Sequence, residues 1–491
     1  MVVVEMSGRR EQGGLRLEEP LSVTHPMSRN DNIRTDSPGE KDVEEGICSF
    51  ASSSSDLKSI EVLPKGWRPY CALLAGFCGM ANCWGIIMSY GTFFRFYKEH
   101  LLLGASDSSV GIIGGIVAFL VLFLSVFVGR LADAQYHRWL LGFGGIMTTL
   151  GYFCLSFTGG DGHDKQGSYG LIFLTQGLIA GVGMACYFMH SSYLSIQSFP
   201  RLRYLAVGIT SAGATTGGVV YPIAISYLLQ KYGFPKGVRL LSVIIAGFST
   251  VAFIFGGPPR HGKKTPLKNA HKIECWFKYG AFKCTPYALF TAAMAMVFFG
   301  YTPLMFHITV WSEQDHIRMV WFLVILNGCA IGGRLASATL ATLGWLSPLL
   351  IQAFFIALAS ILVFCFWPLA HNQNDAIGFC VSLGICLGVI IGIPASCIAH
   401  IIPPEQMGYL GAWTGLMWSS CSLFALAGPP IAGYCVKNFG IVAVGYWTGT
   451  NFALASISVV LAMVTSRRRD MSRVVEARSE DGRMEKPEIT R

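Results

Sequence analysis

Residues 129–138 read GRLADAQYHR and form a short charged segment between two long apolar runs. Gly129 permits a second helix to approach closely, because glycine has no side chain. Asp133 can cap the N-terminus of a neighbouring helix and can also pair with Arg138. The alternative is an ordinary charged turn with no partner elsewhere in the chain. The stretch predicts a turn at a membrane surface, where these residues hold helix ends together.

Apolar runs long enough to cross a membrane recur along the whole chain, since a bilayer core of about 30 Å takes about 20 helical residues. They cover residues 69–96, 108–131, 138–158, 169–196, 204–230, 237–256, 286–312, 318–343, 346–368, 376–402, 407–435 and 440–465. Charged residues make up 13% of the chain, against about 25% in soluble proteins. We therefore expect an all-α membrane protein with twelve transmembrane helices in two six-helix halves, residues 67–256 and 286–466.

Three polar segments lie outside these halves. Residues 1–66 mix charged residues with Ser, Pro and Gly and show no apolar period, so we expect a disordered N-terminal tail. Residues 257–285 form a lysine-rich loop, and the C-terminal tail, residues 467–491, begins with three arginines. Basic segments stay on the cytosolic side of a membrane. We therefore expect both tails and the basic loop to be cytosolic.

Several functional classes are disfavoured by composition and spacing. The net charge of +9 comes from basic residues that flank apolar runs, so we expect no nucleic-acid partner. Neither a Cys-x-x-Cys nor a His-Glu-x-x-His pattern occurs, so we expect no metal site and no cofactor. Residues 257–264 read GPPRHGKK and approximate a phosphate-binding loop, but the final position is Lys and two prolines remove amide donors. We therefore expect a protein that is not an enzyme.

The layout and the charged turn resemble a known superfamily. Six plus six helices joined by a basic loop is typical of carriers built from two repeats, with the substrate site between the halves. GRLADAQYHR is similar to the major facilitator signature Gly-x-Leu-Ala-Asp-Arg-x-Gly-Arg-Arg, and it departs from that signature at Ala134 and Tyr136. The resemblance implies a twelve-helix carrier in which Gly129, Asp133 and Arg138 belong to a cytosolic gate.

A narrower resemblance is carried by three later segments. Residues 199–213 read FPRLRYLAVGITSAG, residues 428–433 read GPPIAG, and residues 327–334 read NGCAIGGR. These segments resemble the monocarboxylate porter family, in particular its fungal branch. The likeness implies that Arg201 and Arg203 belong to the gate, and that Asn327 and Arg334 belong to the substrate site.

Two departures from that family concern proton coupling. The family's first-helix Lys is missing, because residues 84–88 read WGIIM, and Ala330 stands where the family has an acidic residue. Imidazole titrates near physiological pH, so His190 in the fourth span is a candidate proton carrier. The alternative for His190 is a hydrogen-bonded packing residue.

Arg334 is the residue that points most directly to a ligand. It is the only full charge within residues 321–343, and a cation at membrane depth costs about 3 kcal/mol unless it faces water or an anion. A guanidinium grips a carboxylate through two parallel hydrogen bonds. The alternative is that Arg334 reaches the membrane surface or binds backbone carbonyls. We expect Arg334 to bind an anionic group of the substrate.

Other candidates for the substrate site are polar or aromatic residues in helices that line the cavity of this fold. They are Asn82, Tyr187 and Trp311. Each has an alternative role, because a buried carboxamide can join helices and aromatic residues near span ends anchor the protein at the interface.

Taken together, these residues predict a monomeric secondary carrier in the lipid bilayer. Its expected substrate is a small organic molecule, in particular a monocarboxylate or another organic anion. The alternatives are an exporter of a pathway metabolite, a vitamin carrier with neutral cargo, and a membrane sensor that does not transport. We expect the plasma membrane as its location, with the vacuolar membrane as the alternative.

Overall fold

The computed structural model describes residues 66–159, 167–257, 265, 276–314, 319–369 and 372–484. The predicted disordered tail, residues 1–66, lies outside the described residues apart from Gly66. The same is true of most of the basic loop. Within the described residues all regular structure is helical, because backbone polar groups in a lipid core must be paired within each segment.

The N-terminal half consists of the helices that precede residue 257. They are α2 (Arg68–Met80), η2 (Ala81–Gly85), α3 (Ile86–Met88), α4 (Tyr90–Phe96), η3 (Tyr97–Leu101), α5 (Asp107–Phe123), α6 (Ser125–Asp133), α7 (His137–Leu155), α8 (Tyr169–Ile172), η4 (Phe173–Ile179), α9 (Ala180–Ser198) and α10 (Arg203–Phe255). Consecutive pieces join into longer spans, since α2 to η3 form one span and α8 to α9 form another.

The C-terminal half follows the loop. Its helices are η5 (Tyr279–Lys283), α12 (Thr285–Gln314), α13 (Met319–Thr342), α14 (Pro348–Leu369), α15 (Gln373–Gly392), α16 (Pro394–Ile401), η6 (Pro404–Tyr409), α17 (Leu410–Phe439) and α18 (Val442–Met484). Pro394 begins α16 at a position where its missing N–H is not needed. Gly440, with φ +80°, ends α17, because glycine adopts this backbone conformation without strain.

The described helices agree with an all-α membrane fold, and most of the twelve expected spans correspond to helices of sufficient length and hydropathy. Ten helices are long and apolar enough to cross a membrane by length and composition. One of them, α10, is two helices joined at Gly233, whose φ of +72° breaks the helical backbone. The remaining expected span is α7, which has 19 residues. The fold class predicted from the sequence is therefore confirmed.

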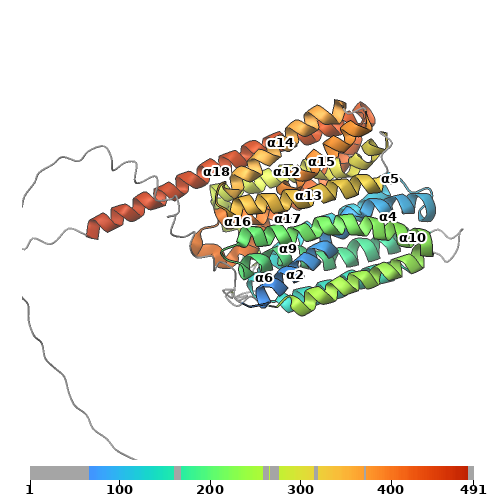
Figure 1. Ribbon diagram of the computed structural model, residues 1–491, viewed down its shortest axis with the longest axis horizontal. Helices are drawn as coiled ribbons and strands as arrows, with labels where there is room; N and C mark the ends of the chain where they lie inside the picture. Colours follow the sequence, from blue (N-terminus) through green and yellow to red (C-terminus); the bar gives the residue numbers. More distant parts are fainter. Residues whose placement is uncertain are drawn as a thin grey trace, which may run out of the picture. The chain divides into compact units, whose positions relative to one another are not determined.

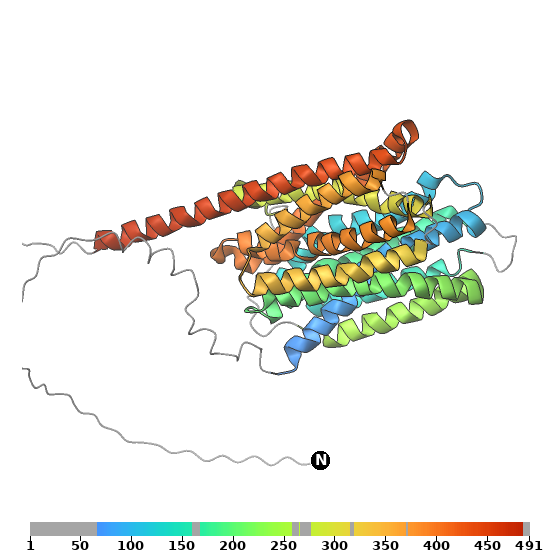
Figure 2. The ribbon, with the colours of Figure 1, turned by 45° about the horizontal axis from the view of Figure 1, so that its top comes forward.

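The two halves meet along three pairs of helices, two of which involve α17. The first part of α10 packs along α13, and α17 packs along α5 and α6. Figure 1 shows α10 (green) beside α13 (yellow), and Figure 2 shows the same neighbours after a rotation of 45°. Large apolar side chains such as Trp139, Val243, Ile254 and Phe439 are exposed on the outside, as lipid-facing residues should be.

The last helix continues beyond the span expected for it. The sequence predicts the end of that span at residue 465, yet α18 remains helical to Met484. In Figure 1 this helix (red) extends past the ends of its neighbours. The first residues of the expected C-terminal tail therefore continue the twelfth helix.

The orientation of the chain remains a prediction and can be tested on sealed vesicles. The basic residues of the loop, residues 257–285, predict that it lies in the cytosol. A protease added outside right-side-out vesicles should therefore leave this loop intact, and permeabilised vesicles should show cleavage there as the control. Cleavage of the loop in sealed vesicles would contradict the orientation.

Candidate functional site

Asp133 connects the two halves at one end of the bundle. Its Oδ1 accepts a hydrogen bond from the Gly411 N–H at 2.9 Å, and its Oδ2 accepts one from the Ala412 N–H at 2.8 Å. Gly411 and Ala412 belong to the first turn of α17, whose free N–H groups attract a carboxylate. Asp133 is fully buried. A residue at the end of α6 thus caps a helix in the opposite half.

The same crossing requires glycine on both helices. A Cβ atom added to Gly129 would collide with the carbonyl oxygen of Gly411, and one added to Gly411 would collide with the carbonyl oxygen of Gly129. One turn further along α17, a Cβ on Gly415 would collide with the carbonyl oxygen of Ser125. The backbones of α6 and α17 are therefore in direct contact.

A residue of the connecting loop completes this arrangement. The Thr265 N–H donates to the Asp133 carbonyl oxygen at 3.0 Å, and Thr265 Oγ1 donates to the Gly408 carbonyl oxygen at 2.8 Å. Arg130 Nη1 donates to the Thr265 carbonyl oxygen at 3.0 Å. We call Gly129, Arg130, Asp133, Thr265 and Gly411 the latch, and the end of the bundle where they lie the latch end.

The other expected gate residues do not take part in the latch. Arg138 is exposed and forms no pair with Asp133, because the carboxylate is turned toward the start of α17. Arg201 is also exposed. Arg203 donates to the Tyr204 hydroxyl at 2.8 Å and lies over its ring. The expected pairing of Asp133 with Arg138 is therefore wrong in this conformation, and α17 supplies the partners instead.

Arg334 lies on α13 where this helix meets α10 of the other half. Only 4% of its surface is exposed. Its Nη1 donates to the Ser211 carbonyl oxygen at 2.6 Å, whereas its buried Nε has no hydrogen-bond partner among the described residues. Among the described residues no carboxylate lies within ion-pair distance of Arg334. Within the described part of the chain, the guanidinium is thus a buried charge with an unpaired Nε and no counter-charge.

Two further residues place Arg334 between the halves. The Tyr301 ring on α12 is buried, and its hydroxyl lies 3.6 Å from the Met88 sulfur on α3. Tyr301 is close enough to Arg334 for an electrostatic interaction. Asn327, two turns before Arg334, packs against Gly218 of α10, where a Cβ atom would lie 2.7 Å from Asn327 Oδ1. Arg334, Asn327 and Tyr301 therefore lie where the two halves meet.

Asn82 has all its polar atoms engaged within the N-terminal half. Its Nδ2 donates to the Ile245 carbonyl oxygen and to Ser249 Oγ, both at 3.0 Å. Its Oδ1 accepts a hydrogen bond from the Tyr221 hydroxyl at 2.5 Å. Asn82 lies in the π-helical turn η2, so the widened turn brings the carboxamide to both parts of α10. These contacts fit the helix-joining role that the sequence left open.

His190 forms a pair with His137, which is not among the predicted site residues. The Nδ1 atoms of His190 and His137 are 3.3 Å apart, and both side chains are buried. One Nδ1 must donate and the other accept, so the two rings have different tautomers when both are neutral. Both Nε2 atoms are buried, and neither has a hydrogen-bond partner in the described ranges of the chain. Because α7 and α9 lie far apart in sequence, no spacing rule predicts this pair.

The two remaining candidates lie inside one half each. Tyr187 is fully buried and packs near Gly79 and Gly145. Trp311 stacks on Trp367 with ring centroids 5.2 Å apart and donates through Nε1 to the Trp367 carbonyl oxygen at 3.3 Å. Both side chains therefore contribute to packing within their halves. Of the six expected substrate-site residues, only Arg334 and Asn327 lie together between the halves.

Comparison with known proteins identifies the family. Residues 72–426 match the sequence model of the Major Facilitator Superfamily, which covers well over half of the chain. The chain therefore belongs to the major facilitator superfamily, as its charged turn and helix count predicted. It is a multi-pass membrane transporter, the class that this superfamily and its fungal relatives define.

Individual relatives agree with this assignment. The chain is 27% identical over 370 residues to the MFS-type transporter dbaD of Emericella nidulans, covering 74% of this chain and 79% of the relative. It is 26% identical over 450 residues to the agnestins efflux protein AgnL12 of Paecilomyces divaricatus, covering 89% of this chain and 97% of the relative. The crystal structure of the human organic anion transporter MFSD10 (TETRAN) covers 81% of this chain and is itself covered completely, with a TM-score of 0.61 and 13% identity. This last likeness concerns the fold alone.

Proposed function

We propose that this transporter is a secondary carrier that moves a small organic anion, such as a carboxylate, by alternating access. The observation that supports the anion is Arg334, a buried guanidinium with a free Nε and no counter-charge among the described residues. An unpaired charge at this depth is costly, and an anionic ligand removes much of that cost. Nε and one Nη of arginine are arranged to hold both oxygens of a carboxylate.

The latch supports alternating access. It joins the halves through hydrogen bonds and backbone contacts that must separate before the latch end can open. In carriers of this design the two halves rock around a central site. A closed latch end corresponds to the state in which the opposite end admits or releases the substrate. With a cytosolic latch this state is outward-facing.

Export across the plasma membrane is the direction we favour, with the vacuolar membrane as the alternative location. The relative from Paecilomyces divaricatus is named as an efflux protein, and the match covers 89% of the present chain. The substrate of that relative is not assigned to this chain, because at 26% identity the substrate sites of the two proteins can differ. A role for His190 and His137 in moving protons remains a hypothesis within this proposal.

Counterflow in proteoliposomes tests the proposal. Vesicles containing the purified full-length protein are preloaded with one unlabelled carboxylic acid from a panel, and uptake of the same labelled acid is measured. Each acid is paired with its amide, which has a similar shape but no charge. We expect accumulation with at least one acid and much less with its amide, because only the acid neutralises Arg334.

The outcomes separate the alternatives. Equal counterflow of an acid and its amide would contradict an anion site and would favour neutral cargo. Saturable binding without counterflow would favour a sensor over a carrier. Empty vesicles and vesicles with heat-denatured protein serve as controls for leakage.

A further inference from the structure

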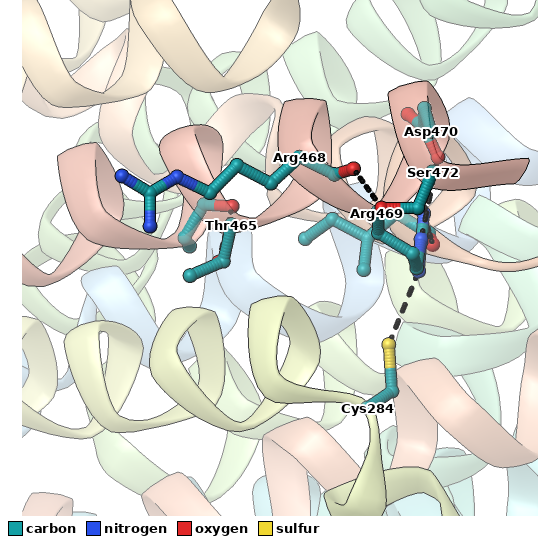
Figure 3. Close-up of polar contacts among 8 residues, drawn as sticks. Cys284, Thr465, Arg468, Arg469, Asp470 and Ser472 are labelled. Carbon is teal, nitrogen blue, oxygen red and sulfur yellow. Dashed lines mark hydrogen bonds and ion pairs between the residues drawn. The ribbon is translucent and has the colours of Figure 1, made fainter. Parts of the chain in front are cut away.

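A basic pocket lies at the latch end of the C-terminal half, away from the interface between the halves. It has a volume of about 390 Å³ and lies between the start of α12 and the charged part of α18. Its polar lining consists of Lys283, Thr285, Thr465, Arg468 and Arg469, together with the Cys284 thiol. Figure 3 shows Thr465, Arg468 and Arg469 on α18, with Cys284 on the neighbouring chain segment. We call this site the basic pocket.

Among the residues that the structure describes, three cations and no acidic residue line the basic pocket. Asp470, which is 58% exposed, contacts Arg469 from outside the pocket lining, with 3.3 Å between Asp470 Oδ1 and Arg469 Nη2. No described residue accepts a hydrogen bond from the side chains of Lys283 or Arg468, and both are exposed. Like charges gathered in one concave site raise the local potential and attract an anion.

Arg469 is held in place and gives the basic pocket a fixed wall. Its Nη1 donates to Cys284 Sγ at 3.2 Å, the contact drawn in Figure 3, and its Nη2 donates to the Ile401 carbonyl oxygen at 2.9 Å. Its side chain is only 22% exposed. A guanidinium that is already ordered loses less entropy when an anion binds. The start of α12 at Thr285 adds the positive end of a helix dipole and an exposed hydroxyl.

An apolar surface leads directly to the basic pocket. Ile457, Val460, Leu461 and Val464 are exposed on α18. At about 100° per residue, Leu461, Val464 and Arg468 lie on the same face of the helix. The apolar run of α18 ends just before Arg467, so the pocket lies at the depth where the lipid headgroups meet the hydrocarbon core.

We propose that the basic pocket binds the phosphate headgroup of an anionic phospholipid, whose acyl chains lie along the apolar face of α18. Lys283 and Arg468 supply the mobile charges, and Arg469 supplies the fixed one. An anionic phospholipid and a free phosphate ion both present a phosphate group with net negative charge. The apolar face beside the pocket favours the lipid over a free phosphate ion, because a free ion makes no use of that surface.

Binding of defined lipids to the purified full-length protein in neutral detergent tests this inference. The probes are dioctanoyl phosphatidic acid, inorganic phosphate and dioctanoyl phosphatidylcholine, which has no net charge. We expect saturable binding of phosphatidic acid and much weaker binding of the other two. The double variant Lys283→Gln with Arg468→Gln should weaken phosphatidic acid binding at least roughly tenfold, with a smaller difference at high salt. Arg469 is left unchanged, since it also holds α18 against Ile401.

The matched control is Arg467→Gln with Lys437→Gln, which removes the same net charge from exposed positions outside the pocket. This control should bind phosphatidic acid as the unmodified protein does. Equal weakening in both double variants would overturn the assignment of the site. Inorganic phosphate binding as tightly as phosphatidic acid would overturn the lipid as its ligand. Neither result bears on the counterflow experiment, because the basic pocket does not contact Arg334.

Discussion

Replacing Asp133 with alanine is expected to open the latch end and to slow exchange of the substrate strongly. The variant leaves the N–H groups of Gly411 and Ala412 without their acceptors in a buried site. A lost partner for a buried donor costs about 1 to 3 kcal/mol, which shifts a two-state equilibrium by roughly five- to 150-fold. Substrate affinity should stay within a few fold, because Asp133 acts on the balance of conformations.

Hydrogen exchange at Gly411 and Ala412 measures this opening without any substrate. Both amides should exchange faster in Asp133→Ala than in the unmodified protein. Their exchange rates in Asp133→Asn should lie between these two, because a carboxamide keeps one acceptor oxygen. Asp375→Ala is the matched control, since Asp375 is an exposed acid in the first turn of α15. Unchanged amide protection together with unchanged substrate exchange would show that Asp133 does not hold the halves together.

Arg334→Lys is expected to weaken transport of an anionic substrate at least roughly tenfold, which is about 1.4 kcal/mol. Lysine keeps the positive charge but cannot present two parallel donors to a carboxylate. Arg334→Gln should weaken it further, because the charge is lost as well. The measurement is concentration-dependent counterflow of the acid that the unmodified protein accumulates.

Correct folding of these variants is checked by thermal stability and by the amide protection of the latch, which does not involve Arg334. The weaker counterflow of the amide analogue, where it can be measured, is the internal control, since transport of a neutral compound should be insensitive to the charge at position 334. Wild-type affinity for the acid in both folded variants would place the anion site elsewhere or make the cargo neutral.

The helices were predictable because each depends on a local property of the chain. Length and hydropathy determine a span, and the expected spans lie close to the helices of the structure. The end of α18 differs, because helical structure continues through the polar residues after residue 466, where hydropathy gives no signal. Gly233 lies inside α10 and interrupts its helical backbone, so this glycine marks the boundary between the fifth and sixth spans.

The contacts of the site were less predictable because they join distant parts of the sequence. The motif indicated that Asp133 caps a helix, but nothing near it identifies α17, which begins at Leu410. Proximity in sequence points to Arg138 as a partner of Asp133, whereas the Asp133 carboxylate accepts hydrogen bonds from Gly411 and Ala412. For Asn82 the need for partners was predictable, because a buried carboxamide must form hydrogen bonds. The structure shows that these partners are Ile245, Ser249 and Tyr221.

The contacts of Thr265 have a consequence for how this protein can evolve. Two of its three hydrogen bonds in the latch use the main-chain N–H and carbonyl groups of residue 265. Every amino acid except proline offers both groups, so most substitutions at this position preserve those bonds, and only the Thr265 Oγ1 bond to Gly408 is lost. Selection on this contact therefore acts on the spacing of the loop more than on its composition. Insertions and deletions between α10 and position 265 should be rarer among descendants of this sequence than changes of residue type.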